Sequence, residues 1–119
     1  MYYAYAGHLF PYRISTRGDV QALESVSYPL GVRDQLTVRV RSTRLESGDY
    51  LFLFSDGVVE ARRGGTDEPF GFERLEASLR RHAGGSVGSL RNGVLTDLEE
   101  FTGAISREDD LTLLVLRLP

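Results

Sequence analysis

Two short acidic motifs hold the residues of this chain that are best suited to chemistry. In the first motif, the apolar run 50–54 is followed by a turn that contains Asp56 and Gly57. In the second motif, Asp109 and Asp110 precede another apolar run. Both motifs place a carboxylate at the tip of a predicted buried strand. Oxygen ligands at rigid strand ends suit a hard divalent cation, because such positions keep the ligand geometry fixed.

The same residues also have simpler interpretations. An Asp-Gly pair after a strand is a common turn, and two aspartates can be no more than a polar lead-in to a strand. His8 follows a glycine and fits a structural hydrogen-bonding role better than binding, although it remains a binding candidate. Similarly, Arg39, Arg41 and Arg44 fit a solvated strand face better than a surface that steers a phosphorylated partner. The sequence shows no Ser-His-Asp order, no Gly-rich phosphate loop and no zinc pattern.

The composition is that of an ordinary globular chain and excludes several classes of protein. Its 119 residues fit one domain or part of one, with 41% hydrophobic and 26% charged residues. A net charge of −3 gives no basic footprint for nucleic acid. The absence of cysteine excludes disulfides and thiolate metal sites and fits a cytoplasmic location. No signal peptide is recognised, and no apolar run approaches the roughly 20 residues that span a membrane.

Strands are predicted in the first half of the chain and at its end. Apolar residues favour strands over 2–6 and 9–14, with a turn at Gly7-His8 between them. Alternation over 36–41 predicts a half-buried strand, whereas the continuous apolar run 50–54 predicts a strand that is covered on both faces. The segment 111–118 is apolar on both faces, which predicts a central strand.

Two helices are predicted between the last two strands. Phe72, Leu75 and Leu79 recur at helical spacing, and the next helix begins after Ser86, which can cap it. An apolar stripe runs along this second helix, with Gly93 inside it at a cost of roughly 1 kcal/mol relative to alanine. Antiparallel strands packed with two helices suggest a layered α+β domain.

Six segments along the chain, taken in their order, resemble one known family. They are 3–8 (Tyr-Ala-Tyr-Ala-Gly-His), 28–32 (Tyr-Pro-Leu-Gly-Val), 45–49 (Leu-Glu-Ser-Gly-Asp), 54–61 (Phe-Ser-Asp-Gly-Val-Val-Glu-Ala), 70–75 (Phe-Gly-Phe-Glu-Arg-Leu) and 109–112 (Asp-Asp-Leu-Thr). This ordered set resembles the PPM-type metal-dependent protein phosphatases, in the SpoIIE/RsbU-like branch. Each segment alone is weak, and the order and spacing make the resemblance specific.

The resemblance implies an α/β/β/α sandwich with a divalent-metal site between the sheets. It implies hydrolysis of phosphoserine or phosphothreonine, often on an anti-sigma-factor antagonist, with two Mn²⁺ or Mg²⁺ ions that activate a bridging water. By position, Asp56 would be a metal ligand, and Gly57 would give backbone freedom beside it. Asp109 would be a second ligand on the same metal, and Asp110 is the less favoured choice.

One departure from the family pattern limits what the resemblance implies. The family's Gly-Asp-x-x-Asp and Asp-x-x-Gly-x-Gly elements, which hold the carboxylate that bridges both metals, are absent from this sequence. Residues 1–119 are therefore expected to be the C-terminal portion of the catalytic domain, with weak or no activity in isolation. The alternative is a non-catalytic binding module that engages a signalling partner or forms a homodimer. An incomplete gene is a third interpretation.

Overall fold

The computed structural model describes residues 1–35, 37–103 and 110–119, which contain short antiparallel strands and three helices. The elements in chain order are β1 (Tyr2–Ala4), β2 (Tyr12–Ile14), β3 (Val20–Ala22), β4 (Val40–Ser42), β5 (Tyr50–Phe54), α1 (Asp56–Val59), α2 (Gly71–His82), α3 (Val87–Thr102) and β6 (Leu113–Arg117). All strand pairs are antiparallel. The α+β class predicted from the sequence is confirmed.

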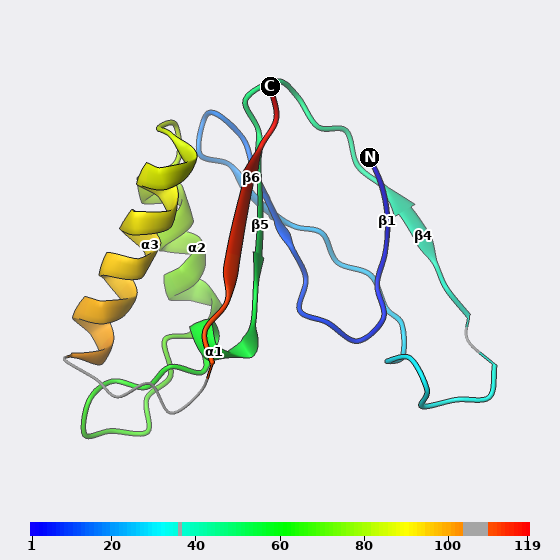
Figure 1. Cartoon of the computed structure of the whole chain (residues 1–119), viewed down its shortest axis with the longest axis horizontal. Helices are drawn as coiled ribbons and strands as arrows, with labels where there is room; N and C mark the ends of the chain where they lie inside the picture. Colours follow the sequence, from blue (N-terminus) through cyan, green and yellow to red (C-terminus); the bar gives the residue numbers. More distant parts are fainter. Residues whose placement is uncertain (36, 104–109) are drawn as a thin grey trace.

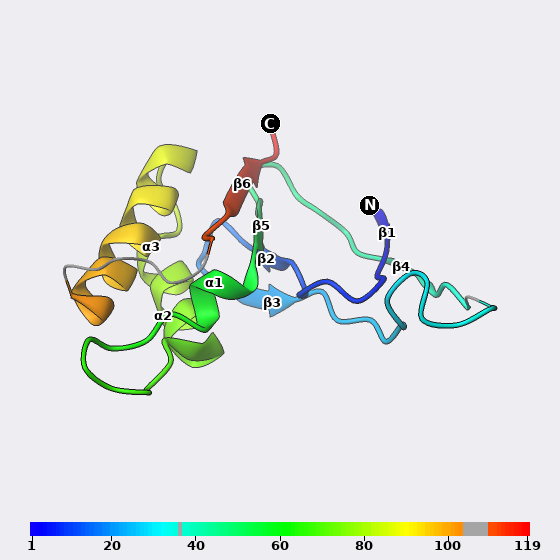
Figure 2. The same cartoon turned by 60° about the horizontal axis from the view of Figure 1, so that its bottom comes forward.

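The strands form two separate sheets. The larger sheet has the strand order β3-β2-β5-β6, and the smaller sheet pairs β1 with β4. Helices α2 and α3 lie on one side of the larger sheet, and the β1–β4 sheet lies on the other side (Figures 1 and 2). The arrangement therefore has three layers, helices, larger sheet and smaller sheet, in agreement with the predicted partial α/β/β/α sandwich.

The hydrophobic core lies between the larger sheet and the helices. Strand β5 supplies its centre, since Tyr50 and Phe52 are fully buried, and this confirms the prediction of a strand covered on both faces. The helices face this strand with residues three or four positions apart, as an amphipathic helix requires. These helical core residues are Leu75, Leu79, Leu90, Val94 and Leu98.

Helices α2 and α3 follow the predicted pattern with one exception. Phe72 lies on the first turn of α2, where its ring and the ring of Phe54 are in a T-shaped arrangement, and 46% of the residue stays exposed. Ser86 caps α3 as predicted, because its side chain accepts a hydrogen bond of 3.0 Å from the backbone N–H of Ser89. Within the described residues, no helix has the length and apolar character needed to cross a membrane.

Gly93 has a packing role that helix propensity alone does not explain. A Cβ atom at this position of α3 would overlap the imidazole ring of His82, lying 2.6 Å from its Cδ2 atom. Glycine therefore lets the C-terminal end of α2 approach α3 closely. The cost of glycine inside a helix is offset by this contact.

Strand β6 differs from its prediction as a central strand. It forms an edge of the larger sheet, with Leu114 51% and Leu116 47% exposed. Only its inner face meets α3, where Val115 is buried. An apolar sequence on both faces of a strand thus does not guarantee that both faces are covered.

Strands β1, β2 and β4 also differ from the predicted pattern. Strands β1 and β2 are shorter than the segments 2–6 and 9–14, although the expected turn between them is present, with Gly7 at a φ of +84°. The predicted strand over 36–41 begins only at Val40, and Leu36 lies outside the described residues. Val38 and Val40 are exposed rather than half-buried. In the described residues, β4 belongs to a sheet of two strands, where it pairs with β1, and burial of these side chains would need a further layer against their face.

Candidate metal centre

The two acidic motifs meet where β5 ends and β6 begins. The antiparallel register pairs Phe54 with Leu113, so the residues beyond these two positions leave the sheet side by side. Ser55 holds the junction: its backbone N–H donates to the carbonyl of Thr112, and its Oγ accepts from the N–H of Thr112, each at 2.9 Å. The Oγ also donates to the carbonyl of Asp110 at 3.4 Å. Helix α1, which begins at Asp56, and the start of β6 therefore lie at the same end of the sheet (Figure 1), and Asp110 precedes β6 by three positions.

Gly57 lets the two motifs approach one another. A Cβ atom here would overlap the carbonyl oxygen of Asp110 and would lie 3.2 Å from its carbonyl carbon and 3.4 Å from the Cα of Leu111. Gly57 is not among the described residues with positive φ, so the expected role of backbone freedom is wrong. The position requires glycine because the neighbouring chain passes so close.

The carboxylates at this junction suit a divalent cation, but they are few. Asp56 opens the short helix α1, and both Asp56 and Asp110 are exposed. Asp109, the preferred second ligand, lies outside the described residues. Among residues 1–35, 37–103 and 110–119, no three acidic, histidine or cysteine side chains gather closely enough to hold a metal. The donor chemistry thus fits part of a hard-cation site, since such ions take six or more oxygen ligands.

His8, the predicted binding candidate, is not joined to the acidic motifs by any hydrogen bond in the described chain. Its Nδ1 lies 3.0 Å from the carbonyl oxygen of its neighbour Leu9, and the side chain is exposed. Beside it, Gly7 packs against Pro29, and a Cβ on Gly7 would lie 2.8 Å from the Cα of Pro29. Two segments that resemble family motifs are therefore in contact, at a turn that does not include the carboxylates.

Asp49 anchors the opposite end of β5, a role that the sequence analysis missed. Its side chain is almost fully buried and accepts from Nε of Arg13 at 2.8 Å and from the backbone N–H of Glu46 at 2.9 Å. The NH2 group of Arg13 lies 2.7 Å from the same carboxylate oxygen. A buried aspartate at the end of a Gly-Asp turn, directly before an apolar run, is the signal that could have revealed this anchor.

A second carboxylate, Asp97, joins the two long helices. It accepts a hydrogen bond of 2.6 Å from Ser78, and it pairs with Arg81 at 3.1 Å and with Nε2 of His82 at 2.9 Å. Burial acts to raise the pKa of Asp97, but the hydrogen bonds from Ser78 and His82 and the charge of Arg81 outweigh burial and lower this pKa. The contacts of His82 with Asp97 and with Gly93 join the two helices and are structural.

Comparison with solved structures places this fold among phosphatase domains. The SiaA-PP2C domain of Pseudomonas aeruginosa superposes with a TM-score of 0.82 and 25% identity, over 99% of this chain and 47% of that chain. The phosphatase domain of SpoIIE from Bacillus subtilis, in a structure described as Mn presoaked, gives a TM-score of 0.71 at 16% identity, over 98% and 50% of the two chains. The chain thus has the fold of about half of a PP2C-type phosphatase domain.

Sequence comparison identifies the family. The family model described as "Stage II sporulation protein E (SpoIIE)" matches residues 1–119. Phosphoserine phosphatase RsbU of Bacillus subtilis (strain 168) is 32% identical over 121 residues, which cover 97% of this chain and 34% of that protein. Stage II sporulation protein E of the same organism is 28% identical over 105 residues, or 86% of this chain and 12% of that protein. The chain belongs to the SpoIIE family of PP2C-type serine phosphatases and spans a minor part of both relatives.

Proposed function

We propose that residues 1–119 form the C-terminal portion of a metal-dependent serine/threonine protein phosphatase domain. Its substrate would be phosphoserine or phosphothreonine in a signalling protein of the anti-sigma-factor-antagonist type. One observation carries the proposal: Ser55 bonds the backbone of Asp110 and Thr112, and Gly57 lets the Asp56 motif lie against the backbone of Asp110. Such close packing of two acidic motifs from distant parts of the chain serves a shared site better than two independent turns.

Each residue at this junction has a distinct role in the proposal. Asp56 and one of Asp109 and Asp110, with Asp109 preferred, would hold Mn²⁺ or Mg²⁺ through carboxylate oxygens. When bound, such ions lower the pKa of a coordinated water and neutralise charge on the phosphoryl oxygens. Ser55 and Gly57 would fix the spacing of the two carboxylates, because one bonds the neighbouring chain and the other lets it approach.

The proposed site is incomplete within this chain. Two or three carboxylates supply fewer oxygen ligands than two divalent ions require, and the described residues contain no cluster that completes the set. We therefore expect the isolated chain to bind Mn²⁺ weakly and to hydrolyse phosphate esters poorly or not at all. The remaining ligands would come from the other half of the domain.

Calorimetric titration with Mn²⁺ tests the assignment of ligands. Weak binding of Mn²⁺ to the unaltered chain should become weaker or undetectable in Asp56→Asn. The matched control is Asp67→Asn, because the side chain of Asp67 is 96% exposed and pairs with an exposed arginine, Arg62. If Asp56→Asn and Asp67→Asn bind Mn²⁺ like the unaltered chain, Asp56 is not a ligand.

Hydrolysis of p-nitrophenyl phosphate with and without Mn²⁺ tests the incomplete site. The isolated chain should show little or no Mn²⁺-dependent turnover. Turnover that depends on Mn²⁺ and vanishes in Asp56→Asn would mean that these residues assemble a working site, for example in a dimer. Tight binding of two Mn²⁺ ions would contradict the incomplete site in the same way.

A second candidate function is a binding module that engages a partner or a second copy of the chain. It is favoured by exposed apolar residues on both sheets, including Tyr2, Val40 and Leu114. Contiguous exposed apolar surface is unusual for a protein that remains alone in solution. Size-exclusion chromatography with light scattering tests self-association: a monomer that persists at all concentrations would exclude the homodimer.

A further inference from the structure

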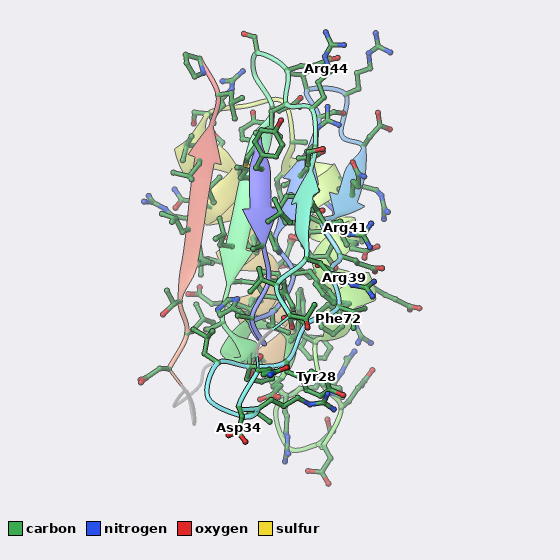
Figure 3. All side chains as sticks on the ribbon, turned by 90° about the vertical axis from the view of Figure 1, so that its right-hand side faces the viewer. Tyr28, Asp34, Arg39, Arg41, Arg44 and Phe72 are labelled. Carbon is green, nitrogen blue, oxygen red and sulfur yellow. The ribbon has the colours of Figure 1, made fainter. Side chains whose placement is uncertain are left out.

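Three arginines lie one after another along β4 and its flanking residues. Figure 3 shows Arg39, Arg41 and Arg44 at successive heights along this strand. All three are exposed, and none of them forms an ion pair or a side-chain hydrogen bond within the part of the chain that the structure describes. We refer to these three residues as the basic strip.

Most other arginines in the described residues have a partner, which makes the basic strip distinctive. Arg63 and Arg74 illustrate the general pattern, since both pair with Glu68 while their guanidinium groups lie over the ring of Phe101. The other arginines with a carboxylate partner are Arg13, Arg62, Arg80 and Arg81. Within the described residues, Arg17, Arg33, Arg91 and Arg117 also lack a carboxylate partner, but they are scattered along the sequence, whereas the three arginines of the basic strip lie within six consecutive residues.

We propose that the basic strip binds an acidic, phosphorylated segment of a partner protein. The proposal rests on the proposed function, in which the substrate is such a protein, and it adds the surface that would hold it. Guanidinium groups bind carboxylates and phosphates through paired, charge-assisted hydrogen bonds. The sequence favoured a strand face that is only solvated. A solvated face would tolerate ion pairs with neighbouring carboxylates, whereas none of the three arginines has such a partner in the described residues.

The length and direction of the basic strip suit an extended peptide. At strand spacing the five steps from Arg39 to Arg44 span at most roughly 17 Å, the length of about five extended residues, and the strand itself covers Val40–Ser42. Figure 3 is turned about the vertical axis of Figure 1, so heights correspond between the two views. Arg39 is the member closest in height to α1, where Asp56 lies, and Arg44 is the furthest. A segment bound along the basic strip would therefore run toward the end of the molecule that carries the candidate metal centre.

Nucleic acid fits this surface less well than an acidic peptide. Binding to a phosphate backbone needs an extended basic footprint, whereas this chain is acidic overall with a pI near 5.4. Three arginines in a row match a short run of carboxylates and one phosphate. The partner chemistry we assign is therefore a protein segment that contains phosphoserine and several glutamates or aspartates.

Fluorescence anisotropy with a labelled peptide tests the proposal. The probe is a short fluorescein-labelled peptide with one phosphoserine and several glutamates, and its neutral counterpart carries serine and glutamine instead. The full chain should bind the acidic probe at low salt and not the neutral one. The variant Arg39→Gln/Arg41→Gln/Arg44→Gln should raise the Kd about tenfold, given the usual strength of exposed charge pairs. Added NaCl should weaken binding in the unaltered chain.

The matched control removes the same charge elsewhere. The variant Arg17→Gln/Arg80→Gln/Arg91→Gln has equal net charge and should change the Kd less than about twofold. Equal weakening in both variants, or no binding of the acidic probe, would overturn the proposal. Equally strong binding of a single-stranded oligonucleotide would overturn it in favour of nucleic acid. The anisotropy assay measures binding without turnover. Its result therefore does not depend on whether the chain hydrolyses phosphate esters, and the two proposals can fail separately.

Discussion

Replacing Gly57 by alanine is the most direct perturbation of the junction between the two acidic motifs. The added methyl group would overlap the carbonyl oxygen of Asp110 and lie 3.2 Å from its carbonyl carbon. Ordinary contacts between such atoms are about 3.5–4 Å, so the backbone at 110–111 would have to shift by roughly 1 Å. The clash is with backbone rather than with a flexible side chain, and no change of rotamer can relieve it.

The cost of Gly57→Ala follows from two opposing effects. Overpacking of a buried position typically destabilises by about 1–3 kcal/mol, whereas alanine in place of glycine within a helix stabilises by up to about 1 kcal/mol. We expect a net loss of about 1–2 kcal/mol. For a chain of this size that corresponds to a decrease of roughly 4–10 °C in Tm, measured by circular dichroism.

Gly88→Ala provides the matched control. Gly88 lies in the first turn of α3, where an added Cβ would meet only the Oγ of Ser86, at 3.8 Å. This variant should be as stable as the unaltered chain or more stable, because only the gain in helix propensity applies. If Gly57→Ala behaves like Gly88→Ala in Tm and in Mn²⁺ titration, the two acidic motifs do not touch as described.

Three further substitutions test the contacts around the site. Asp49→Ala should lower the free energy of unfolding by about 3–5 kcal/mol in urea, because it leaves the partly buried Arg13 without its partner; a loss below about 1 kcal/mol, as expected of an exposed pair, would refute the anchor. Asp97→Asn should cost about 1–3 kcal/mol at pH 6. Because the pKa of Asp97 is lowered in the folded state, its contribution to stability is present above the unfolded pKa near 3.9 and is lost as pH falls through the folded pKa. Urea unfolding should therefore show a smaller difference in stability between the unaltered chain and Asp97→Asn at pH 3 than at pH 6. An equal difference at both pH values would argue against the charged network. Ser55→Ala should cost about 1 kcal/mol in thermal unfolding, whereas Ser55→Thr keeps the hydroxyl and should cost less; equal effects of the two would refute the role of the hydroxyl.

The sequence was informative where burial follows from a continuous pattern. Strand β5 and the helical positions Leu75 and Leu79 were predicted correctly, because long apolar stretches and helical spacing leave few ways to bury these residues. The pattern failed for β6, since an apolar sequence does not reveal whether another layer is present to cover its outer face. The predicted half-burial of Val40 was wrong for the same reason. An alternating pattern shows which residues share a face of the strand, but it does not show what packs against that face.

Within the candidate site, residue types could be predicted and contacts could not. Asp56 stood out because a carboxylate after a buried strand suits a cation. The role of Gly57 depends on the approach of Asp110, more than fifty positions away along the chain, and local backbone reasoning gave the wrong explanation. Ser55 was missed as a bridging residue for the same reason, because its partner Thr112 is distant in sequence.

The pairing of β5 with β6 has a consequence for how the chain folds. Ser55 and Thr112 are separated by 57 positions, whereas Ser78 and Asp97, which join α2 to α3, are separated by 19. Closing the longer loop costs more chain entropy, so the helical hairpin can form early while the strand pair closes late. Opening of the sheet edge would then separate the two aspartate motifs while the helices remain paired, so hydrogen exchange should report lower protection at Thr112 than at the core of α3.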